Sequence, residues 1–361
     1  MALPSIRFEK RLTYTRTSSI LTTMLAILLA FGAVAILFAI LGLDVAAAFQ
    51  TILEVFITPR LFFQAVVRGV PITLAALGLA IAFRMNFWNI GAEGQIYMGA
   101  FASTGIVLAH VYYGFLSEAL VLPAMFLVAF LAGGAWCLLP AALKAKLNVN
   151  EILTTLMMNF IAYLWVAYLI YGPWRDPEGF GFPLSIPFPD YAKFLFVAGN
   201  QAYTGFTITL LVATLIYLLF KYGKLGFELT VIGQSLDAAR YAGINISKAI
   251  ILGAFLSGGL AGVGGLSILS GIIGRLRPDL SPGYGYTAII VSFLAALNPW
   301  LIVPAGIFFG GLFTAGEALQ ATLKIPGAAV DMFQSIIFIF IIFGEFLKRY
   351  RIVVGGAGSG G

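Results

Sequence analysis

The sequence has 361 residues, of which 61% are hydrophobic and only 10% are charged, and its mean hydropathy is +0.99. A soluble domain carries about 25% charged residues, so this chain has too few charges to cover a water-facing globule, and its apolar surface must face lipid. The single cysteine, Cys137, excludes an internal disulfide, and the single histidine, His110, excludes a metal site built on two histidines. We therefore predict an all-α, polytopic membrane protein.

The formal net charge of +6 comes from basic residues that flank apolar runs, not from a basic face suited to nucleic acid. This distribution is typical of cytoplasmic loops between membrane spans. The residues form four clusters: Arg7, Lys10, Arg11 and Arg16; Lys144 and Lys146; Lys221 and Lys224; and Lys348, Arg349 and Arg351.

Apolar segments in chain order predict about ten transmembrane helices. The second and the eighth are short for a bilayer core of about 30 Å, and Gly- and Pro-containing segments adjoin both. Short or broken helices at matching places in two halves indicate a central pathway. The segments are residues 19–43, 70–83, 96–113, 119–143, 152–171, 205–222, 249–273, 286–297, 301–323 and 332–346.

The basic clusters also predict the topology. With the N-terminus inside, an even number of spans returns the C-terminus to the inside, and every main basic cluster then lies in the cytoplasm. We expect a cytoplasmic basic N-terminus (1–18), one transmembrane domain (19–346) and a cytoplasmic tail (347–361) whose glycine-rich end resembles a linker. The loop 172–204 would lie outside and the loop 223–248 inside, in a multi-pass protein of the cytoplasmic membrane.

A polar, Gly-containing break at residues 83–95 separates two apolar spans. Its residues Asn89, Glu93 and Gln95 run straight into apolar Ile96. Irregular polar backbone at membrane depth survives only where protein or a water-filled cavity shields it. This pattern favours a pathway lining or a buried structural network, with pairing of Glu93 to Arg84 as a structural alternative, over a simple cytoplasmic turn.

A comparable break occupies residues 274–286 in the second half. We expect Ser281, Tyr284 and Tyr286 to face the first break across a central polar cavity. Residues 283–288 match G-x-G-x-x-A, but they follow no strand, so a dinucleotide site is a false positive. The sequence contains no G-x-x-x-x-G-K-[ST], so we expect no ATP hydrolysis by this chain.

The predicted inner loop 223–248 contains the pattern of a short helix. Ser235 suits the N-cap, Asp237 the first turn, Arg240 the last turn, and Gly243 the left-handed position after the helix. Such a helix is either a surface connector or a docking element for a cytoplasmic partner.

The segments 83–95 (F-R-M-N-F-W-N-I-G-A-E-G-Q) and 233–245 together resemble permease subunits of ABC importers. The group includes simple-sugar, nucleoside and branched-chain amino-acid permeases; the resemblance covers about residues 70–352 and looks closest to the nucleoside type. It implies three partners: a second permease chain, identical or different; a cytoplasmic ATPase with two nucleotide-binding domains, which would hold ATP and Mg; and an external substrate-binding lipoprotein. By this resemblance the chain binds no cofactor or metal and is no enzyme, and the residues coupled to the ATPase are Gly233, Ser235, Asp237, Ala238, Ala239, Arg240, Tyr241 and Gly243.

We therefore expect a permease subunit of an ATP-driven nucleoside importer. A permease for a simple sugar such as a pentose or galactoside is the alternative, since both substrates need aromatic stacking and hydrogen bonds to hydroxyls. An ion-coupled carrier needs intramembrane ionisable groups, and only Glu93 and Glu317 are candidates. A membrane-embedded enzyme is a further alternative, but we find no paired nucleophile and base in this sequence. A purely structural membrane scaffold would not need two polar breaks at matching positions.

Overall fold

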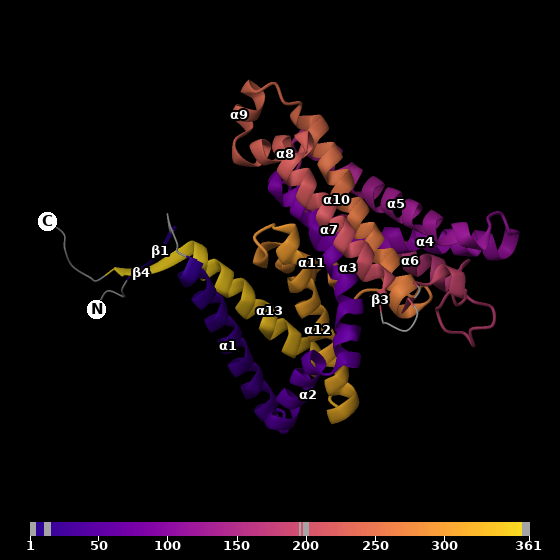
Figure 1. The fold of residues 1–361 in the computed structure, drawn as a ribbon, viewed down its shortest axis with the longest axis horizontal. Helices are drawn as coiled ribbons and strands as arrows, with labels where there is room; N and C mark the ends of the chain where they lie inside the picture. Colours follow the sequence, from indigo (N-terminus) through magenta and orange to yellow (C-terminus); the bar gives the residue numbers. More distant parts are fainter. Residues whose placement is uncertain (1–4, 11–15, 195, 198–201, 356–361) are drawn as a thin grey trace. The chain divides into compact units, whose positions relative to one another are not determined.

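The computed structural model describes residues 5–10, 16–194, 196–197 and 202–355, which form α-helices α1 to α13 with short strand, 3₁₀ and π segments between them (Figure 1). The all-α prediction is confirmed. The chain divides into two compact units, one made of Met1–Val55 with Ala315–Gly361 and the other of Phe56–Thr314.

The first unit pairs the two ends of the chain. It contains α1 (Arg16–Ile40), α2 (Val45–Ile57) and α13 (Gly327–Arg349), and strands β1 (Ser5–Lys10) and β4 (Tyr350–Gly355) pair antiparallel. Helix α1 packs along α13, where the rings of Phe38 and Phe333 stack with centroids 6.0 Å apart.

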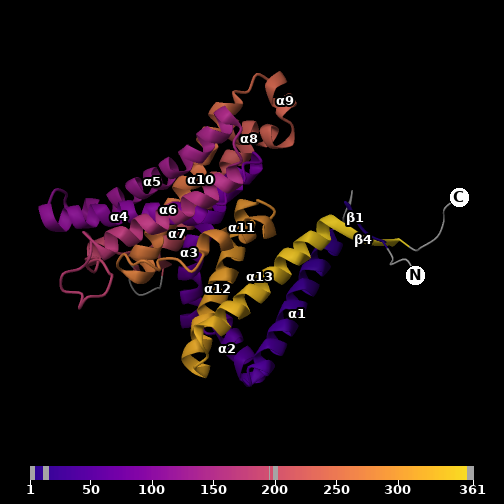
Figure 2. The ribbon, with the colours of Figure 1, turned by 180° about the vertical axis from the view of Figure 1, so that it is seen from behind.

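The second unit is a helical bundle around α10 (Figures 1 and 2). Its helices are α3 (Pro59–Arg84), α4 (Ala92–Tyr113), α5 (Glu118–Leu147), α6 (Glu151–Tyr171), α7 (Thr204–Tyr222), α8 (Lys224–Gln234), α9 (Leu236–Tyr241), α10 (Ile246–Ile268), α11 (Tyr284–Leu294) and the start of α12 (Pro299–Leu323). A π-helical turn, η2 (Leu269–Ile273), extends α10, and η1 (Asp190–Ala192), β2 (Phe196–Val197) and β3 (Ala202–Tyr203) lie between α6 and α7.

Glycines allow α10 to occupy the centre of this bundle. An ideal Cβ added to Gly99 of α4 would lie 2.1 Å from the carbonyl oxygen of Gly262, and one added to Gly133 of α5 would lie 2.3 Å from that of Gly258. Backbones that approach this closely tolerate no side chain, which is the usual way in which membrane helices pack through dispersion forces.

Each of the ten predicted spans lies on a helix. Within the described residues, eight helices are long and apolar enough to cross a membrane. The prediction of a short eighth span is confirmed by α11, which has 11 residues, but that of a short second span is wrong, because α3 has 26. Arg60, Gln64 and Arg68 interrupt the apolar run without interrupting the helix. Helices α2 and α8 were not predicted.

The two loops of interest lie at opposite ends of α10 (Figure 1). Helices α8 and α9 precede its first residue, whereas the loop after α6 bonds to its far end. There the N–H groups of Phe188 and Phe194 donate to the carbonyl oxygens of Gly274 and Ser270, at 2.8 and 2.9 Å. The bundle therefore carries one structured loop at each end.

Candidate functional site

The polar break after α3 runs into the interior of the second unit. Asn89 is fully buried; its amide donates to Gln95 Oε1 at 3.0 Å and to Ser257 Oγ at 3.1 Å, and Gln95 donates back to Asn89 Oδ1 at 3.0 Å. Ser257 lies about 16 Å along α10 from its first residue, given a rise of about 1.5 Å per residue. The break is thus a buried polar network at membrane depth rather than a surface turn.

Asn159 of α6 holds the start of α4 in place. Its Oδ1 accepts the N–H of Gly94 at 2.8 Å, and its amide donates to the carbonyl of Ile90 at 3.0 Å and to Tyr286 Oη at 3.2 Å. One side chain therefore pairs with an N–H that α4 leaves unpaired at its N-terminus, with a carbonyl of the segment before the helix, and with α11. We did not single out Asn159 from the sequence, although an amide inside the apolar run 152–171 was a signal.

Glu93 joins α4 to the start of α11. Its Oε2 accepts the N–H of Gly285 at 2.7 Å, while Ser281 Oγ accepts those of Gly283 and Tyr284 at 3.2 and 2.9 Å. An ideal Cβ on Gly285 would lie 2.3 Å from Glu93 N, so glycine is required at this contact. A carboxylate at a helix N-terminus also complements the helix dipole. The short helix is therefore anchored at its N-terminus by Glu93.

The predicted pathway residues come together but differ in exposure. The two breaks meet through the Glu93–Gly285 bond, and Tyr286 remains 40% exposed. Tyr284 is only 2% exposed and packs edge-on against Phe313, with centroids 4.9 Å apart. The alternative in which Glu93 pairs with Arg84 is wrong, because the Arg84 guanidinium lies 4.0 Å above the Phe220 ring.

The short helix of the loop 223–248 forms as the sequence predicts. In α9, Ser235 Oγ accepts the N–H of Ala238 at 3.2 Å, Asp237 pairs with Arg240 at 3.1 Å, and Gly243 has φ +70°. Ala239 is fully buried. The other predicted coupling residues of the helix are exposed: Asp237, Ala238, Arg240 and Tyr241. One face of α9 thus packs on the bundle and the other is open.

A direct contact links this loop to the polar break. The Asn86 amide donates to the carbonyl of Gly233 at 2.6 Å, and an ideal Cβ on Gly233 would lie 2.1 Å from the carbonyl oxygen of Arg84. The end of α8 therefore lies against the first residues of the break that leads to Asn89 and Glu93.

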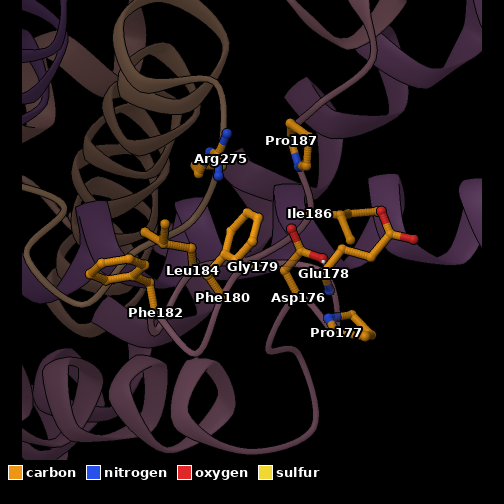
Figure 3. A pocket seen from close by; sticks show the side chains of 10 residues that line it. All are labelled: Asp176, Pro177, Glu178, Gly179, Phe180, Phe182, Leu184, Ile186, Pro187 and Arg275. Atoms are coloured by element: carbon orange, nitrogen blue, oxygen red, sulfur yellow. Dashed lines mark hydrogen bonds between the residues drawn. The ribbon is translucent and has the colours of Figure 1, made fainter.

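The loop after α6 forms a cavity of about 570 Å³ at the opposite end. Figure 3 shows its lining: Asp176, Pro177, Glu178, Gly179, Phe180, Phe182, Leu184, Ile186, Pro187 and Arg275. Phe180 is 97% exposed, whereas Ser185 is fully buried and its hydroxyl accepts the N–H of Leu276 at 2.9 Å. Farther along the loop, the Lys193 ammonium, bonded to Asp190 at 2.8 Å, lowers the pKa of that carboxyl.

Residues 61–342 match the protein family described as branched-chain amino acid transport system / permease component. The chain belongs to this permease family. Glucose ABC transporter permease protein TsgB13 of Haloferax volcanii is 34% identical over 80% of this chain and 78% of its own. Guanosine ABC transporter permease protein NupP of Bacillus subtilis is 27% identical over 90% and 94%, and nucleoside ABC transporter permease protein NupB of Lactococcus lactis is 24% identical over 74% and 77%.

These relatives confirm the resemblance to ABC permeases. These relatives are named as permeases of ABC transporters rather than as enzymes. Family membership also implies an ATPase and a substrate-binding partner. The eight apolar helices of spanning length found in the described part of the chain agree with a membrane location.

Proposed function

We propose that this permease forms the membrane passage of an ATP-driven importer of nucleosides. The observation that carries the proposal is the similarity to the guanosine permease NupP, which extends over 90% of this chain and 94% of that relative. A further nucleoside permease, NupB, is similar over 74% of the chain. ATP and Mg would bind to the partner ATPase, and this chain would supply the passage and the surface that couples to it.

A simple sugar is the second candidate substrate. It is favoured by the 34% identity with the glucose permease TsgB13, which exceeds the identity with either nucleoside permease. The hydroxyls of a sugar and of a nucleoside ribose form similar hydrogen bonds, so the polar side chains of Asn159 and Tyr286 suit both substrates.

The proposed topology places α9 in the cytoplasm and the loop after α6 outside. The basic side chains of Lys144, Lys146 and Lys224 gather at the end of the bundle that carries α9, as the positive-inside rule requires of a cytoplasmic end. Both termini would then be cytoplasmic, and the cavity beside Phe180 would face the external binding protein.

The proposed coupling route runs from α9 to α11. Motion of the ATPase would push the open face of α9, and the Gly233–Asn86 bond would pass the displacement to the polar break. Glu93 would carry it to the N-terminus of α11 through its bond to Gly285. Ser281 and the exposed Tyr286 would then line the moving wall of the passage, while Asn89, Gln95 and Tyr284 hold the backbone behind it. In alternating access, one group of helices usually rocks or opens against another while the substrate site between them stays fixed.

The substrate is tested by competition. The permease, coexpressed with its ATPase and binding protein in cells that lack other nucleoside and glucose uptake, should accumulate labelled guanosine. Unlabelled nucleosides should suppress this uptake, while glucose should not. If the cells instead take up glucose and nucleosides do not suppress that uptake, the substrate is a sugar. If the cells take up neither guanosine nor glucose, both proposed substrates are wrong.

A further inference from the structure

We propose that this permease has a binding site for the phosphate headgroup of an anionic phospholipid at the membrane boundary near α9. A cavity of about 310 Å³ lies where the ends of α3 and α7 meet the turn between α11 and α12. Arg84 is the last residue of α3, and Lys221 is the penultimate residue of α7. Both side chains line the cavity, together with Tyr217, Phe220 and Asn298.

The two cations in this cavity have no carboxylate partner. Neither occurs in the ion pairs among the described residues, and no lining residue is acidic. Their neighbours are aromatic faces: Arg84 lies 4.0 Å above Phe220, and Lys221 Nζ lies 5.5 Å from the Tyr217 centroid. A ring face holds a cation without neutralising its charge, so both charges remain available to an anion.

The remaining lining suits a headgroup held at an interface. Asn298 also lines the cavity, and its Oδ1 accepts the N–H of Trp300 at 3.0 Å. Trp300 is 45% exposed, and its ring lies 6.2 Å from that of Tyr217. Tryptophan and tyrosine concentrate at the level of lipid headgroups, and anionic lipids attract basic residues beside helix ends. A soluble anion would need the cations but not this aromatic border.

The site also adjoins the proposed coupling route. Gly233 packs against the carbonyl oxygen of Arg84, and it lies two residues before Ser235, the N-cap of α9. A bound headgroup would therefore restrain the end of α3 beside the contact between Asn86 and Gly233.

The test uses Trp300 as the only fluorophore. The other four tryptophans of this chain, Trp88, Trp136, Trp165 and Trp174, are replaced by Phe, and the purified full-length permease chain is placed in phosphatidylcholine vesicles with a small share of phosphatidylglycerol brominated near its headgroup. Each basic side chain near an anionic headgroup contributes about fivefold in affinity, so the two together predict about a 25-fold preference over brominated phosphatidylcholine. Lys221→Gln should reduce the preference about fivefold.

The control is Lys224→Gln, three residues away and outside the cavity, where the lysine is 3.8 Å from Glu228. It should leave quenching unchanged. Native mass spectrometry of the complex with all tryptophans intact repeats the comparison, with retained phosphatidylglycerol expected in the parent and lost in Arg84→Gln/Lys221→Gln. Equal quenching by both lipids, an equal loss in Lys224→Gln, or displacement of the brominated lipid by inorganic phosphate would each overturn the proposal.

Discussion

Glu93 offers the sharpest test of how the two polar breaks are joined. Its Oε2 accepts the N–H of Gly285 at 2.7 Å inside the bundle. In Glu93→Ala this buried donor loses its partner, which costs about 1–3 kcal/mol. If the cost falls on the transport-competent arrangement of α11, uptake should fall by about 5- to 150-fold.

Two further substitutions separate charge from reach. Glu93→Gln keeps an acceptor oxygen at the same length and should retain most of the uptake. Glu93→Asp keeps the charge but withdraws the oxygen by about one carbon–carbon bond, or about 1.5 Å, which breaks the bond to Gly285. It should therefore behave like Glu93→Ala.

The assay is initial uptake in reconstituted vesicles, normalised to assembled complex and accompanied by thermal unfolding of each variant. A well-assembled Glu93→Ala complex with the uptake of the parent would refute a role for this bond in transport. Recovery by Asp but not by Gln would show that the charge acts, and not the anchoring of α11.

Other positions give independent tests. Ala239→Glu places a charge on the fully buried side of α9, and burying an unpaired charge costs several kcal/mol. Uptake should therefore fall at least about tenfold while ATP hydrolysis continues, whereas uptake equal to that of the parent would show that the loop is only a connector. In a Cys137→Ala background, Phe180→Cys should react with an impermeant thiol reagent in intact cells and Ser235→Cys should not; the reverse pattern would invert the topology. Gly99→Leu would lie against the Gly262 backbone and should reduce the yield of folded protein in detergent, whereas normal yield and thermal stability would contradict the packing of α4 on α10.

Hydropathy and capping chemistry predicted much of the fold. The apolar runs located ten helices, and the local pattern from Ser235 to Gly243 predicted α9 because its cap, ion pair and left-handed glycine depend only on near neighbours. The start of α3 was missed because Arg60 and Arg68 end an apolar run but not a helix. Helix α2 was not predicted because Gln50 and Glu54 interrupt its otherwise apolar sequence with polar residues.

The candidate site was predicted by residue but not by partner. Polar residues at membrane depth indicated Asn89, Glu93 and Gln95, yet their partners Ser257 and Gly285 lie more than 160 residues away in the chain. Such pairings depend on how α10 and α11 pack against α4, which no local pattern encodes. Pairing of Glu93 with Arg84 was the structural alternative that the sequence left open, whereas in the structure the backbone N–H of Gly285 donates to the carboxylate.

The central claim is ATP-driven import through this chain, and accumulation in sealed vesicles tests it most directly. The complete complex is reconstituted with the external binding protein on the side of Phe180 and ATP supplied to the side of α9. The account predicts that labelled guanosine accumulates against its gradient only when ATP is hydrolysed, and that an imposed sodium or proton gradient alone gives none. Accumulation driven by an ion gradient without ATP would contradict it.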